Sequence, residues 1–427
     1  MTILDNNKTK KMNKISVLLI LATLFGVLIT SVAIYSIESE KRSLSEDLIE
    51  LSKVKYGLFS VDEWEEILSD IIAKRINDFD LEEANNEKMR EKISNFLQIA
   101  IDELEIAYDE KKGLLSRVGA SVFDVFGHME EEIPTITEGI LEYMNNPENR
   151  EQIKGYLLEK MNEYSKATFS EIDYSLYNQI LEQQSADSKE EAIEVLKSKI
   201  ETLANKRSVY SIILFSLVVL IFLWTAFTKD IAQIEFVFLT FICTILLVVG
   251  VLLPMINIDA RVSEMNFQLM GESIKFTDQV LYFKSKGILE VVTLMISNKK
   301  VDVMLVGFLV LLFSVLFPFS KLLSSLIYLF SEKAKNSKII SFLVFKTSKW
   351  SMADVMVVAI FMAYIGFSGI ISEQLADIEN IAPSLDILTT NASSLQVGFF
   401  IFTSFAVLSL IVSHKLQYRL KSEDKAK

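Results

Sequence analysis

The sequence predicts an all-α membrane protein with six transmembrane helices, a helical periplasmic domain and a small β-hairpin-like external segment. Hydrophobic residues make up 51% of the 427 residues, and only five residues are proline. A helix needs about 20 apolar residues to cross a bilayer. Six uncharged apolar runs are close to that length: Ile15–Tyr35, Ser208–Thr228, Phe236–Ile258, Val303–Ser320, Val355–Ile371 and Val397–Ser413.

The first run can be interpreted as a membrane anchor or as a cleavable signal peptide. Ser31, Val32 and Ala33 form a small-x-small triplet near its end, as cleavage sites do. The run is, however, longer than the apolar region of a usual signal peptide and long enough to span a bilayer. We therefore interpret residues 15–35 as a retained anchor.

The distribution of basic residues predicts the orientation, because lysine and arginine concentrate in cytoplasmic loops. Lysines cluster in residues 8–14, in the loop 333–349 and in the tail beyond the sixth run. Six crossings place all three clusters on one side, so we expect both termini in the cytoplasm. Residues 36–207, 259–302 and 372–396 are then external.

Charge is divided unevenly between the external domain and the rest of the chain. Residues 38–207 hold 39 of the 56 acidic residues but 21 of the 43 basic ones, a net charge of −18. Such a domain stays soluble and offers no basic face for nucleic acid. The single cysteine, Cys243, and the two histidines, His128 and His414, cannot build a zinc cluster or a Cys–His nucleophile. We expect no cofactor, no metal and no enzymatic activity.

Helical periodicity runs through the acidic domain, 36–207. The segment 188–207 leads directly into the second run, 208–228, and predicts one helix that continues from the domain into the membrane. Its apolar seam fits either packing within the domain or a short coiled coil. Three helical faces are predicted: Trp64, Ile67, Leu68, Ile71, Ile72 and Ile76; Met89, Ile93, Phe96, Leu97, Ala100 and Leu104; and Ile193, Leu196, Ile200 and Leu203.

The two shorter external segments differ from each other. In 259–302, alternating Met265, Phe267 and Leu269 predict a strand, and residues 273–283 are expected to complete a short hairpin. The stretch KGILEVVTLMISNKK, 286–300, is typical of an amphipathic helix near the membrane surface. Residues 372–396 are polar and are expected to form turns.

Two ionisable residues lie at the ends of apolar runs, Lys321 directly after the fourth and Asp354 directly before the fifth. An unpaired charge inside a membrane span costs several kcal/mol. Lys321 and Asp354 both lie near the cytoplasmic ends of neighbouring antiparallel spans, so we expect them to form a buried pair. Ser314, Ser351 and Thr403 would complete an intramembrane polar network. A structural interpretation remains open: Asp354 caps its helix with Ser351, Lys321 extends to the headgroups, and Pro318 only kinks the span.

Three stretches carry recognisable motifs: LPMINIDAR at 253–261, with Pro254; SVLFPFSKLL at 314–323; and KWSMADVMVVAIFMAYIGF at 349–367. Together they resemble the paraquat-inducible protein A (PqiA) family of bacterial inner-membrane proteins, with Met356 in place of the usual aromatic residue. The resemblance extends over about 235–415, which is expected to form one four-helix membrane domain followed by the cytoplasmic tail 416–427.

The resemblance implies a non-enzymatic part in lipid transport between the inner membrane and the periplasm. Its implied partners are membrane lipids and a periplasmic tunnel protein with mammalian-cell-entry domains. It also implies that Ser314, Lys321, Ser351, Asp354 and Thr403 line a polar network. The chain departs from longer family members, because it has one such domain and too few cysteines for their CxxC zinc ribbons. An envelope-stress sensor and an ion-coupled transporter of small solutes remain alternatives.

Overall fold

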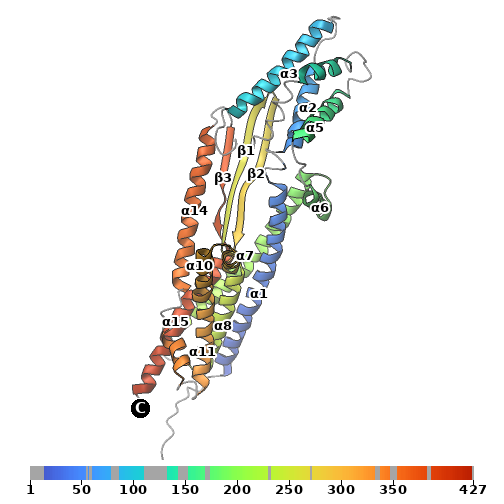
Figure 1. Cartoon of the computed structure of the whole chain (residues 1–427). Coiled ribbons are helices and arrows are strands. Elements are labelled where there is room, and N and C mark those ends of the chain that lie inside the picture. Colours follow the sequence, from blue (N-terminus) through green and yellow to red (C-terminus); the bar gives the residue numbers. More distant parts are fainter. Residues whose placement is uncertain are drawn as a thin grey trace, which may run out of the picture.

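The computed structural model describes residues 14–53, 56, 60–77, 86–109, 132–142, 152–168, 174–228, 232–269, 272–331, 337–346, 353–381 and 386–425. The molecule is elongated, with a helical bundle at one end and a sheet covered by helices at the other (Figure 1). Six helices in the described part are long and apolar enough to cross a membrane. They coincide with the six predicted runs, so the predicted fold class of an all-α membrane protein is confirmed.

Two long antiparallel helices, α1 (Lys14–Leu51) and α7 (Lys189–Phe227), form what we call the stalk. At 1.5 Å per residue each is about 57 Å long, so each continues well beyond a hydrocarbon core of about 30 Å. The predicted continuity of α7 from the domain into the membrane is confirmed. Leu196 of the predicted seam packs with Leu51 and with Ile180 of α6 (Ser175–Gln184), so the chain itself covers the seam.

The membrane bundle is built around the pair α8 (Gln233–Leu252) and α15 (Val397–Lys425). Their backbones touch, because a Cβ added at Gly250 would lie 2.9 Å from the amide nitrogen of Phe402. A Cβ at Gly398 would lie 2.4 Å from the carbonyl oxygen of Pro254. Only glycine leaves room for contacts this close, so these positions fix how the two helices pack.

The fourth span combines α10 (Val301–Leu311), the π-helical turn η3 (Leu312–Leu316) and α11 (Phe317–Phe330). Pro318 is the second residue of α11, two positions after η3 ends. Proline has no amide hydrogen to donate and its ring crowds the carbonyl four residues earlier, here that of Ser314. A widened turn relieves this crowding, so the kink predicted at Pro318 takes the form of a π-bulge. After the span come the short α13 (Lys338–Ser341) and η4 (Phe342–Lys346).

The sheet is larger than the short hairpin that the sequence predicted. Strand β1 (Ile256–Leu269) pairs antiparallel with β2 (Glu272–Lys286), with β3 (Asp386–Asn391) on its other side and with the short β4 (Ser394–Leu395). The strand order is β2-β1-β3. Residues 372–396, expected to be turns, instead hold β3, β4 and the end of α14 (Ala353–Ile381). The helix α9 (Ile288–Ile296) follows β2, as predicted.

The acidic helical domain and the sheet share one hydrophobic core. The helices α2 (Val61–Asn77), α3 (Asn86–Asp109) and α5 (Ile153–Thr168), with a helical segment at 132–142, pack around one face of the sheet. In the described residues, side chains from 36–207 and from the sheet thus belong to one hydrophobic cluster. The shared core, called the outer core below, contains Leu68, Ile71, Ile72, Met89, Ile93, Leu97, Ile136, Ile140, Ile153, Leu157, Ala260, Val262, Met265, Ile274, Phe276 and Leu375.

Candidate functional site

Lys321 lies in α11 with its side chain inside the bundle. It is 5% exposed, and no other described residue makes a hydrogen bond or ion pair with its ammonium group. Electrostatic interactions reach it from Cys243 of α8 and from Asp354 of α14. An unpaired cation in this position is costly in a membrane, which makes Lys321 the strongest candidate for a functional residue in the spans.

The direct Lys321–Asp354 ion pair that the sequence predicted is not formed. No carboxylate oxygen of Asp354 lies within 4.0 Å of the Lys321 ammonium, and Asp354 is exposed while Lys321 is buried. The reason is the rotation of α14 about its own axis. Adjacent helix residues point about 100° apart, and Ala353 occupies the buried position at the start of α14. Asp354 therefore shares the exposed face of α14 with Val358 and acts on Lys321 only at longer range.

The remaining predicted residues are separated. Ser314 is 3% exposed inside η3, one helix segment before Lys321. Thr403 donates its hydroxyl hydrogen to the carbonyl oxygen of Phe399 at 2.8 Å, within its own helix α15. Ser351 lies outside the described residues. Of the predicted network, the structure thus brings Ser314 and Lys321 onto one span and leaves Asp354 near them.

Sequence reasoning missed a polar strip on α11. Ser324 and Ser325 lie three and four residues after Lys321 and are each 6% exposed. The Ser325 hydroxyl donates to the Lys321 carbonyl oxygen at 2.7 Å. Their helical spacing from Lys321 was a usable signal, because positions i, i+3 and i+4 share a face. Cys243 gave no such signal, since only the packing of α8 against α11 brings it near.

The helix α14 connects the bundle to the sheet. In its candidate span 6% of the residues are buried, against 56% in the spans of α8 and α15. Toward the end of the helix, Leu375 is 4% exposed and belongs to the outer core. The Asn391 side chain of β3 donates hydrogen bonds to the Ser368 carbonyl at 2.8 Å and to the Ser372 hydroxyl at 3.1 Å. One helix therefore exposes apolar residues at membrane depth and packs on the sheet outside.

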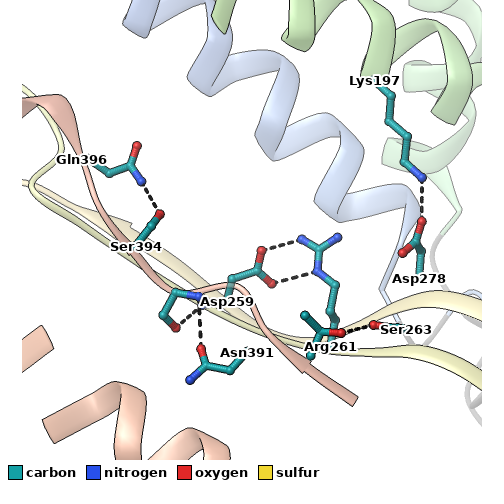
Figure 2. Close-up of polar contacts among 10 residues, drawn as sticks. Lys197, Asp259, Arg261, Ser263, Asp278, Asn391, Ser394 and Gln396 are labelled. Carbon is teal, nitrogen blue, oxygen red and sulfur yellow. Dashed lines mark hydrogen bonds and ion pairs between the residues drawn. The ribbon is translucent and has the colours of Figure 1, made fainter. Parts of the chain in front are cut away.

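Ion pairs connect the stalk to the sheet and to α9. Near the sheet, Lys197 of α7 forms an ion pair of 2.6 Å with Asp278 of β2 (Figure 2). Nearer the bundle, Arg42 of α1 pairs with Glu290 at 2.5 Å, and Glu290 also accepts a hydrogen bond from the Gly287 amide at the start of α9. The stalk is thus fixed both to the sheet and to the first turn of α9.

The face of the sheet opposite the outer core is polar. On β1, the Asp259 carboxylate accepts two hydrogen bonds from the Arg261 guanidinium (Figure 2). Asp259 is 7% exposed, so this paired geometry compensates its burial. The Asp259 amide donates to the Ser393 hydroxyl at 3.1 Å, which ties β1 to the turn after β3. These bonds stabilise the sheet where it meets the bundle.

Comparison with known proteins gives one match. The family model described as Paraquat-inducible protein A matches residues 284–376, from the end of β2 to the outer part of α14. The match includes the motifs around Lys321 and Asp354, and it excludes the stretch 253–261 and the sixth span. No curated protein and no solved structure matches the chain. With its six potential membrane-crossing helices, the chain is a multi-pass membrane protein, and its residues 284–376 match the family model of Paraquat-inducible protein A.

Proposed function

We propose that the protein handles phospholipid between the inner membrane and the periplasm without catalysing a chemical reaction. In this proposal both termini are cytoplasmic, and the sheet, the outer core and the upper stalk are periplasmic. A tunnel protein with mammalian-cell-entry domains would exchange lipid with the periplasmic part. The family match is consistent with an envelope function. The apolar exposed side of α14 and the buried cation Lys321 make lipid the best-supported substrate.

The continuity of α14 is the observation that carries the proposal. Its 29 residues extend about 43 Å, longer than the hydrocarbon core. At membrane depth the exposed side chains are apolar, with Val358 60% and Met362 61% exposed. Ile371 then packs against the outer core, and Leu375 is buried in it. An acyl chain that leaves the bilayer along this helix would keep contact with apolar side chains up to the sheet.

Lys321 is assigned the role of a headgroup-binding cation on the bundle side of this path. A phosphate group is the common anion of phospholipids, and a desolvated ammonium without a protein carboxylate is free to bind it. The buried serines on the same face, Ser314 and Ser325, add hydroxyl groups nearby. Asp354, exposed and interacting at longer range, would weaken anion binding rather than form a closed pair with Lys321.

Mass spectrometry of the lipids that co-purify with the full-length protein tests this proposal. Lys321→Ala is expected to lower the molar ratio of bound phospholipid to protein while the protein remains in the membrane. Lys338→Ala, at an exposed lysine in α13, is the matched control and should leave that ratio unchanged. Asp354→Asn should raise or preserve the ratio. If Lys321→Ala retains as much lipid as the wild type, Lys321 has only a structural role and the proposal fails.

A second candidate function is an envelope-stress sensor, and the continuity of the stalk favours it. Both α1 and α7 connect the acidic helices to the membrane without interruption. Deleting the acidic helices would not separate the two functions, because it would also expose the sheet face of the outer core. Arg42→Ala is the better test, since it removes the ion pair between the stalk and α9 and otherwise affects only the pair with Glu46 inside α1. A sensor should lose its response to envelope stress in this variant, whereas lipid co-purification should persist.

A further inference from the structure

The segment 284–300 joins the sheet to the bundle and has an unusual distribution of charge. Its helix α9 is flanked by Lys284 and Lys286 on one side and by Lys299 and Lys300 on the other. None of the four ammonium groups makes an ion pair or hydrogen bond with a described residue, and three of them are exposed while Lys286 is partly so. The adjoining acidic residues are Glu290, which Arg42 already pairs with, and Asp302. The segment is therefore a net cationic strip.

The height of this strip places it at the boundary of the membrane. Strand β2 ends and α10 begins where the sheet meets the bundle (Figure 1). The end of α9 packs directly on α10, because a Cβ at Gly307 would lie 2.7 Å from the Cβ of Met295. Gly307 lies six residues inside α10, which is about 9 Å along the helix. The end of α9 thus lies about 9 Å deeper than the first residue of α10, while Lys299 and Lys300 lie beside that residue.

The two faces of α9 differ as expected for a helix at a lipid interface. Ile288 and Val292 are each 3% exposed and pack into the bundle core. Leu294 is 59% and Val291 39% exposed. An interfacial helix buries its apolar face about 5–10 Å into the boundary between headgroups and acyl chains, with basic residues at headgroup level. The depth and the flanking lysines of α9 match that arrangement.

We propose that α9 and its four flanking lysines form a binding surface for phospholipids with anionic headgroups, such as phosphatidylglycerol, in the outer leaflet. The exposed apolar side chains of α9 contact the acyl chains, and the lysines contact the phosphates. The surface lies in the family-matched segment and directly above the span that carries Lys321. Its role as the place where lipid is selected rests on the proposed function, but its preference for anionic headgroups does not.

The test compares the lipids that the full-length protein retains after reconstitution in vesicles of phosphatidylcholine with and without phosphatidylglycerol. Each lysine near an anionic surface contributes about fivefold in binding, so Lys299→Gln with Lys300→Gln should lower the phosphatidylglycerol preference by up to about 30-fold. The quadruple variant that adds Lys284→Gln and Lys286→Gln should lower it further. The corresponding Lys→Arg variants keep the charge and should keep the preference.

A matched control replaces two exposed lysines elsewhere, Lys88 of α3 and Lys338 of α13, by glutamine and should retain the wild-type preference. An equal preference in the quadruple variant and the wild type would overturn the inference. So would a loss of preference on adding inorganic phosphate at constant ionic strength, because the site would then bind free phosphate rather than a lipid surface. Failure of the proposed function appears differently, as unchanged total lipid in Lys321→Ala.

Discussion

Replacing Leu375 by alanine should detach the outer end of α14 from the sheet. Leu375 is 4% exposed in the outer core, so nearly the full transfer free energy of a leucine side chain, about 1.5–3 kcal/mol, depends on this contact. The cavity left behind brings typical Leu→Ala losses to about 2–5 kcal/mol. The hydrogen bonds from Asn391 to Ser368 and Ser372 hold α14 in place and prevent it from closing the cavity. We expect a loss of about 3 kcal/mol, near the middle of that range.

The assay is reversible unfolding of the full-length protein in mixed micelles, read out by circular dichroism, with lipid content measured on the same samples. Ile370→Ala is the matched control, because this neighbouring residue is 58% exposed. It should change the free energy of unfolding by less than about 0.5 kcal/mol. Leu375→Ala should also lose bound lipid, because the apolar path along α14 is interrupted. Equal losses of stability in the two variants, or unchanged lipid content in Leu375→Ala, would refute the continuous path.

Two further predictions concern packing and pH. Gly250→Leu should destabilise the bundle by at least about 1–3 kcal/mol, because the leucine side chain would collide with the backbone of Phe402. The midpoint of SDS-induced unfolding measures this loss. Gly366→Leu is the control and should not lower that midpoint, because a Cβ at Gly366 meets nothing within 4 Å. On the sheet, the Lys275 ammonium lowers the pKa of Glu264 below its ordinary 4.5. The interaction between Lys275 and Glu264 therefore stabilises the folded protein fully above pH 4.5, and this contribution is lost as the pH falls through the lowered pKa of Glu264. Glu264→Gln removes the titrating carboxylate and should make the thermal midpoint less sensitive to acid in that range.

The candidate site could be predicted only in part, and the polar residues near α14 show why. The sequence correctly indicates Lys321 as a buried residue, because it lies at the end of an apolar run and is followed by Leu322 and Leu323. It could not indicate that Ala353 rather than Asp354 faces the bundle, since α14 turned about its axis by one residue fits the same apolar pattern. The nearness of Cys243 and the burial of Ser324 also depend on how α8 and α11 pack. A polar contact needs both partners placed to within about an ångström, which local patterns do not supply.

The sequence by itself determined the six membrane-crossing helices and the continuous α7, because length and hydrophobicity are local properties that the bilayer selects. Its motifs also carried the resemblance to paraquat-inducible protein A, but over a wider range, about 235–415, than the matched residues 284–376. Only the tertiary structure decided that β3 pairs with β1, more than 120 residues earlier, and that the acidic helices, the sheet and Leu375 bury their apolar faces together. Strand pairing and core formation between distant segments depend on the shapes of both surfaces. Each surface is complete only after the chain has folded, so neither segment alone carries that information.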